Sequence, residues 1–108
     1  MTGENRLKKE KDFNLVFNKG KRLFSSKLSV VFVPADSIKV GFAVGKKHGG
    51  SVKRNRIKRL LRESFRSFVP NLNQNFFFVF IQKVKEDYSL NAFIESMGYL
   101  FKKGGFID

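Results

Sequence analysis

The sequence predicts an α+β domain, a two-layer sandwich built around a mixed four-stranded sheet. The expected order is helix, two or three strands, basic helix, strand and last helix. Apolar residues recur at helical spacing near both ends of the chain and in its middle, and short runs rich in valine and phenylalanine lie between. A chain of 108 residues suits one domain with a modest core, so residues 1–108 are expected to fold together.

The chain begins with a polar, basic stretch that precedes a short helix. Residues 1–9 are expected to form a loose arm. Residues 10–19 are expected to be helical, and a glycine follows them as a stop signal. Phe13, Val16 and Phe17 stand at i, i+3 and i+4, as on one face of a helix. The two phenylalanines could be core residues or part of a binding surface, and periodicity leaves both interpretations open.

Four segments have the composition of β-strands. They are short, rich in β-branched or aromatic residues, and three of them lie next to turn-forming residues. The fourth is apolar until its final residue, which is typical of a central strand buried on both faces. The predicted strands are Arg22–Ser25, Lys27–Pro34, Lys39–Val44 and Phe76–Gln82.

The third predicted strand alternates large and small side chains. Its large residues at 40, 42 and 44 are expected to face the core, which leaves Gly41 and Ala43 on the other face. Small side chains there would allow either a ligand or a helix backbone to approach the sheet closely. Both interpretations remain open.

A glycine-rich loop leads into a strongly basic helix. Gly49 and Gly50 allow the chain to turn sharply, and Ser51 stands where a helix N-cap is expected. No proline or glycine follows until Pro70. At 100° per residue, one side of this helix is apolar and is expected to pack. That side holds Ile57, Leu60, Leu61, Ser64, Phe65 and Phe68.

The opposite side of the basic helix carries a narrow cationic stripe. Like charges three or four residues apart repel by about 0.2–0.5 kcal/mol per pair, and only Glu63 is available to offset them. A solvated charged face is the ordinary interpretation. The scarcity of acids instead favours a phosphate-bearing ligand, because the planar guanidinium fork suits phosphate oxygens. The stripe consists of Asn55, Arg59, Arg62 and Arg66, with Arg56 and Lys58 beside it.

The last predicted helix is expected to be a core element. Ser89 stands at the N-cap position, and Gly104-Gly105 follows the helix as its end. A polar loop at 70–75 and a connector at 83–87 flank the strand before it. The apolar side chains of this helix at helical spacing are Leu90, Phe93, Ile94, Met97, Leu100 and Phe101.

Composition narrows the class of partner. The 22 lysines and arginines against 9 acids give a formal net charge of +13, which attracts polyanions. Nucleic acid is the first candidate and a membrane surface the second. The absence of cysteine excludes disulfides and thiolate metal sites. No segment suits a signal peptide or a membrane span, so a cytoplasmic protein is expected.

No catalytic group and no metal site are predicted within the chain. The nine carboxylates show no spacing expected of a two-metal nuclease, and there is no P-loop or nucleophile–base pair. His48 is the only histidine and lies in the glycine-rich loop, where an incidental loop residue is favoured over an acid–base catalyst. The chain alone is therefore not expected to be a catalyst.

The basic helix and the first helix together resemble the bacterial ribonuclease P protein component. The resemblance covers roughly residues 6–103, and the arginine–asparagine–arginine block is its most specific part. In the middle of the chain it lies in Lys46-Lys47, the glycine-rich turn, and Val52-x-Arg54-Asn55-Arg56-Ile57-Lys58-Arg59-x-x-Arg62-Glu63. Near the N-terminus it lies in Arg6-Leu7-Lys8-Lys9, Asp12-Phe13, Val16-Phe17 and Gly20.

This resemblance implies a ribonucleoprotein in which the RNA subunit, with bound Mg²⁺, removes the 5′ leader from precursor tRNA. The protein would assist by holding both RNAs, and no obligate protein partner is inferred. The resemblance also implies a rare left-handed connection between the strands on either side of the basic helix. The residues implied to bind the catalytic RNA subunit are Lys46, Lys47, Lys53, Arg54, Asn55, Arg56, Lys58, Arg59, Arg62 and Arg66.

In that family, aromatic residues of the first helix and a neighbouring sheet face grip the single-stranded leader. The positions implied here are Phe13, Phe17 and Val31, with Phe32 as the alternative to Val31. Stacking on aromatic rings tolerates any base, at about 1–3 kcal/mol each, which suits a leader of variable sequence.

Two other functions share the charge and size of this chain. A structural rRNA-binding protein without a processing role is the main alternative. A cationic protein of membrane surfaces or compacted DNA is less favoured, because the apolar stripes are expected to be used in a core.

Overall fold

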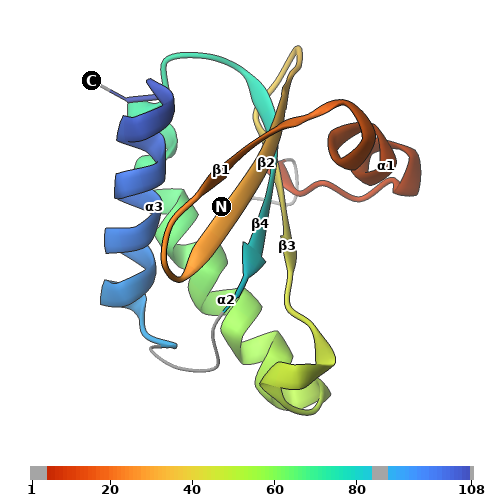
Figure 1. Ribbon diagram of the computed structural model, residues 1–108, viewed down its shortest axis with the longest axis vertical. Helices are drawn as coiled ribbons and strands as arrows, with labels where there is room; N and C mark the ends of the chain where they lie inside the picture. The colour runs from red at the N-terminus through yellow and green to blue at the C-terminus, as the bar shows by residue number, and fades with distance from the viewer. Residues whose placement is uncertain (1–4, 84–87, 108) are drawn as a thin grey trace.

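The structure is a computed structural model that describes residues 5–83 and 88–107. Figure 1 shows a central sheet with α2 and α3 on one side and α1 on the other. Residues 1–4 of the expected arm and 84–87 of the expected connector lie outside the described residues. The elements are α1 (Glu10–Lys19), β1 (Lys21–Phe24), β2 (Leu28–Pro34), β3 (Lys39–Ala43), η2 (Lys46–His48), α2 (Ser51–Phe68), η3 (Val69–Asn71), β4 (Phe76–Gln82) and α3 (Leu90–Gly104).

The sheet confirms the predicted α+β class with a mixed four-stranded sheet. Its strand order is β1-β2-β4-β3, with antiparallel β1–β2 and β2–β4 pairs and a parallel β3–β4 pair. Helix α2 connects the two parallel strands, and the hand of that connection stays a prediction. The predicted strands begin and end within one residue of the observed ones.

One face of the sheet carries the main core, which α2 and α3 cover. Phe65 of α2 lies with its ring centroid 5.8 Å from that of Phe78 and 6.0 Å from that of Phe80, and also 6.0 Å from that of Phe101 on α3. The predicted packing side of the basic helix is confirmed, since Ile57 and Leu61 are also buried there. This face and its two helices form the predicted two-layer sandwich.

The opposite face of the sheet is only partly covered, by α1. A smaller core lies beneath this helix, formed by Leu7, Val16, Val31 and Val79. Phe77 and Ile81 on β4 remain half-buried on this face, so β4 is central in the sheet but its continuous buried stretch is only Phe78–Phe80, with Gln82 buried beyond it. The prediction of a strand buried on both faces therefore holds only for its middle, because α1 is too short to cover the rest.

The expectation of a loose arm is wrong for residues 5–7. Arg6 forms a parallel β-bridge with Val40, and the Leu7 amide donates to the Val40 carbonyl at 2.9 Å. The Asn5 side-chain amide donates to the Ile38 carbonyl at 3.0 Å. Leu7 is buried, so these residues extend the sheet past β3 and close its outer edge.

The helix ends agree with the sequence at α3 and differ at α2. The Ser89 hydroxyl accepts from the Ala92 amide at 3.2 Å, and Gly105 adopts a left-handed conformation, with φ of 75°, as the C-cap. At α2 the N-cap is Gly50, which offers no side chain, and Ser51 is already helical. The predicted Ser51 cap is wrong by one residue, because Gly49, with φ of 126°, turns the chain into the helix earlier.

Within the described residues, no helix combines the length and the apolar character that crossing a membrane requires.

Replacing Leu7 with alanine is expected to lower the free energy of unfolding by about 2–5 kcal/mol, because the side chain fills the core beneath α1. Urea denaturation followed by circular dichroism measures this loss. The neighbouring Lys8 is exposed, so Lys8→Ala is the matched control, with an expected change within about 0.5 kcal/mol. An equally small effect of Leu7→Ala would contradict the docking of this segment.

Candidate nucleic-acid interface

The cationic stripe of α2 faces outward. Asn55, Arg59 and Arg66 are exposed, while Arg62 is half-buried. Neither Arg59 nor Arg62 forms an ion pair with any carboxylate among the described residues. Their charge is therefore available to an external anion. The other predicted RNA-binding residues of this helix are exposed or half-buried, namely Lys53, Arg54, Arg56 and Lys58.

The one acid of α2 offsets this charge only weakly. Glu63 Oε1 lies 3.9 Å from Arg66 Nη1, and both side chains are more than half exposed. Exposed pairs of this kind contribute about 0–1 kcal/mol. The arginines thus repel one another in the free protein, and a polyanion would relieve that repulsion.

Arg62 links α2 to the sheet. Its guanidinium lies 6.0 Å from the centre of the Phe42 ring on β3. Burial lowers the pKa of Arg62, and the positive charges of Arg6 and Arg59 lower it further. Its Nε is buried without a hydrogen-bond partner. An anion bound to the exposed part of this guanidinium would supply a negative charge close to Arg6, Arg59 and Arg62.

A small cavity of about 140 Å³ joins the basic helix to α1. Three cations and two aromatic rings line it, and no acid among the described residues does. Sequence reasoning did not single out Arg6 or Phe42 for this site, because only the docking of residues 5–7 on β3 brings them together. The lining residues are Arg6, Leu7, Phe13, Val40, Gly41, Phe42, Lys58 and Arg62.

Phe13 and Phe17, the predicted leader-binding residues of α1, lie in different surroundings. The Phe13 ring lies over Gly41, so closely that a Cβ on that glycine would be 2.5 Å from the ring. The small face predicted for β3 therefore receives an aromatic side chain instead of a ligand or a helix backbone. Phe17 is 38% exposed, so it remains accessible to a ligand.

Val31 does not match the role that the resemblance implied. It is fully buried beneath α1, against Val16 and Val79, and cannot touch a ligand in this conformation. Phe32 lies on the other face, where it contacts Phe76 and Phe106. Half-buried apolar side chains on this face of the sheet are instead those of Val33, Phe77 and Ile81. The continuous apolar run of β4 concealed the last two in the sequence.

The loop before α2 holds Lys46 and Lys47 at the surface. Lys47 Nζ donates to the Lys83 carbonyl at 2.9 Å, which ties the loop to the end of β4. His48 is buried, so the expectation of an incidental loop residue is wrong, and a structural role replaces it. Its Nε2 donates to the Gln82 carbonyl at 3.1 Å, which leaves Nδ1 to accept from the Tyr88 hydroxyl. Burial raises the pKa of Tyr88, which favours the protonated hydroxyl needed for this bond.

Among residues 5–83 and 88–107, no group of three histidine or carboxylate side chains is arranged to hold a metal ion.

Comparison with known proteins agrees with this geometry. The family model described as Ribonuclease P matches residues 1–105. A ribonuclease P protein component from an Exiguobacterium species is 35% identical over 95% of this chain and 92% of its own length. One from Natranaerobius thermophilus is 43% identical over 75% of this chain and 72% of its own.

Solved structures show the same architecture. The RNase P protein from Thermotoga maritima superimposes with a TM-score of 0.78 at 30% identity, covering 91% of this chain and 96% of that one. The RNase P protein of Staphylococcus aureus gives a TM-score of 0.82 over 96% of this chain and 98% of that one, and its 24% identity supports the fold alone. The chain described here therefore belongs to the bacterial ribonuclease P protein component family.

Proposed function

We propose that this chain assists a catalytic RNA subunit in the endonucleolytic removal of the 5′ leader from precursor tRNA. The observation that carries the proposal is the continuity of two surfaces. A cationic stripe on α2 and an aromatic surface on α1 meet at the cavity that Arg6, Lys58 and Arg62 line. Such an arrangement can hold phosphates on one side and unpaired bases on the other.

The stripe and the loop before it would bind the catalytic RNA. Guanidinium groups fork onto phosphate oxygens, and the lysines add point charges. The proposed contacts are Lys46, Lys47, Lys53, Arg54, Asn55, Arg56, Lys58, Arg59, Arg62 and Arg66. The chain itself would supply no reacting group, and hydrolysis would belong to the RNA subunit with its bound Mg²⁺.

The leader would lie against α1 and the open face of the sheet. Phe13 and Phe17 offer rings, Phe77 and Ile81 extend the apolar surface, and the buried Val31 supports them from below. By neutralising phosphates near the cleavage site, the cations would also favour local Mg²⁺ occupancy. The proposal implies a protein of the cytoplasm.

Reconstitution tests the proposal directly. The catalytic RNA subunit and precursor tRNA are incubated at low Mg²⁺ with and without this protein. The expected result is faster release of the 5′ leader when the protein is present. The complex should also bind precursor tRNA more tightly than mature tRNA. Equal binding without any gain in processing would favour the alternative, a structural rRNA-binding protein.

The double variant Arg59→Ala, Arg62→Ala is expected to weaken the salt dependence of binding to the catalytic RNA. The log–log slope should become shallower by about 1.4–1.8, because each lost phosphate contact contributes roughly 0.7–0.9. Affinity measured over a range of KCl concentrations gives the slope. The control is the double variant Lys21→Ala, Lys102→Ala, which removes the same charge from exposed positions outside α2. It should change the log–log slope little. Equal slopes for the two double variants would show that the stripe is not the RNA-binding face.

Phe17→Ala is expected to reduce the preference for precursor over mature tRNA without altering the salt slope, because it removes a stacking ring and no charge. Because Phe17 is 38% exposed, the loss of unfolding free energy should stay well below the ~3–5 kcal/mol of an emptied core site. Leu15→Ala is the control, since Leu15 is also exposed on α1 but two residues away around the helix. A core-sized loss of stability would instead make Phe17 a structural residue.

A further inference from the structure

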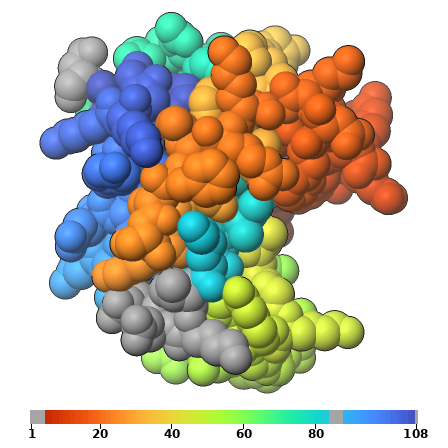
Figure 2. Space-filling model, in the orientation of Figure 1, coloured from red at the N-terminus to blue at the C-terminus, as the bar shows by residue number. Residues whose placement is uncertain are grey.

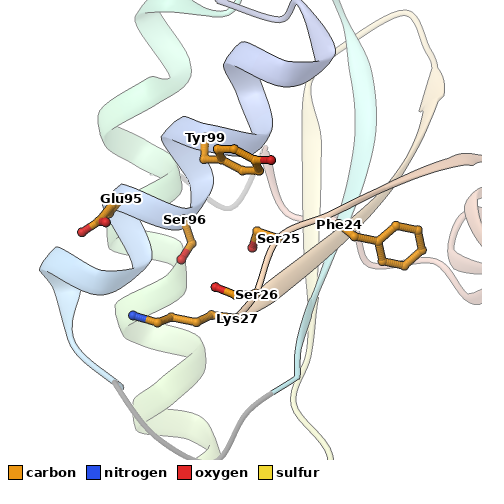
Figure 3. Close-up of a pocket in the computed structure, with 7 residues that line it drawn as sticks. All are labelled: Phe24, Ser25, Ser26, Lys27, Glu95, Ser96 and Tyr99. Carbon is orange, nitrogen blue, oxygen red and sulfur yellow. The ribbon is translucent and has the colours of Figure 1, made fainter.

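Phe24, at the end of β1, is an exposed aromatic residue that the proposed contacts do not include. It is 51% exposed. In Figure 3 its ring points away from α3, whereas Tyr99 and Ser96 of α3 lie on the other side of the hairpin. Phe24 therefore belongs to the face of the sheet that α1 partly covers.

Strand register places Phe24 in a row that crosses the whole sheet. Phe24 pairs with Ser29, Ser29 with Ile81, and Ile81 with Ala43. The neighbouring row on the same face contains Val31 and lies beneath α1. Two residues along a strand separate the rows by about 7 Å. The row therefore consists of small and apolar side chains next to α1. Ser29 within it is buried, whereas Phe24 at the β1 end is half exposed.

Cations border this row. Lys83 Nζ lies 5.4 Å from the centre of the Phe24 ring and 3.5 Å from the Ser25 carbonyl oxygen. Lys47 Nζ is bound to the Lys83 carbonyl, which brings a second ammonium group to the same end of β4. Neither lysine pairs with a carboxylate of the described residues. Figure 2 shows the hairpin, the end of β4 and the loop before α2 next to one another on the surface.

The strand order gives this surface a direction. The basic stripe of α2 meets the sheet at β3, where Arg62 lies over Phe42. From there the strands follow in the order β3, β4, β2 and β1. A single strand that leaves the stripe at Arg62 and crosses the strands in this order reaches Phe24 last.

We propose that Phe24 and Lys83 form an additional subsite for single-stranded RNA, which binds a leader nucleotide at the β1 edge of the sheet, apart from those at Phe13 and Phe17. The base stacks on the Phe24 ring, and Lys83 neutralises an adjacent phosphate. This inference rests on the proposed function, since it extends the same leader path. With this subsite, the affinity for precursor tRNA depends on the length of the leader.

The experiment measures the affinity of the complex between this protein and the catalytic RNA for precursor tRNAs whose leaders are trimmed one nucleotide at a time. With long leaders, Phe24→Ala is expected to weaken binding by roughly 5- to 150-fold, the range for one stacked base. With leaders too short to reach β1, the complex that contains Phe24→Ala should bind precursor tRNA with the same affinity as the complex that contains the unaltered protein. Phe24→Tyr, which keeps a ring, should retain the affinity for long leaders.

Tyr99→Ala is the matched control. Tyr99 is 54% exposed and has Lys103 5.6 Å from the centre of its ring. It lines the same cavity beside the β1–β2 hairpin as Phe24, but from α3, and its ring lies on the α3 side. It should leave binding unchanged at every leader length. Equal losses for Tyr99→Ala and Phe24→Ala would overturn the subsite.

Failure of this inference is distinguishable from failure of the proposed function. If the unaltered complex prefers precursor over mature tRNA while Phe24→Ala behaves like it at all leader lengths, the subsite is wrong and the proposed function stands. If the unaltered complex shows no preference for a leader, the proposed function fails and this inference fails with it.

Discussion

The burial of Phe65 against the sheet is the interaction on which the rest of the structure depends. Its ring contacts Phe78, Phe80 and Phe101, and so fixes α2 to β4 and α3 at once. Burying such a ring contributes about 3–5 kcal/mol as judged by truncation, whereas each like-charge pair on the other side of α2 costs only about 0.2–0.5 kcal/mol. Packing therefore outweighs repulsion, and α2 can present a cationic surface that would be unfavourable in an isolated helix.

The helices could be predicted from the sequence because their apolar residues recur at helical spacing, and the strands because they are short runs of β-branched or aromatic residues. The apolar spacing of α2 and α3 identifies both the helices and their buried sides. This composition identifies the strands to within a residue. The cationic stripe follows from the same helical geometry. To predict the stripe, the only tertiary information required is that the opposite side of α2 packs in the core.

What the sequence did not reveal depends on contacts between distant segments. The polar residues around Leu7 resemble a loose arm until the open edge of β3 offers them hydrogen bonds. The burial of Val31 depends on where α1 lies, and strand composition cannot give that position. The partial exposure of β4 on the α1 side could not be predicted for a related reason. Its apolar run does not distinguish a side chain under a helix from one beside it.

The buried His48 has a consequence for the energetics of RNA association. Its two ring nitrogens fasten the loop to the Gln82 carbonyl and the Tyr88 hydroxyl, and Lys47 is anchored to the Lys83 carbonyl. The loop that carries Lys46 and Lys47 is therefore rigid before any nucleic acid arrives. Immobilising a mobile side chain on association costs about 0.5–1.5 kcal/mol. Because folding already fixes this loop, RNA association pays less of that entropic cost. More of the electrostatic attraction between the lysines and the RNA then contributes to the affinity.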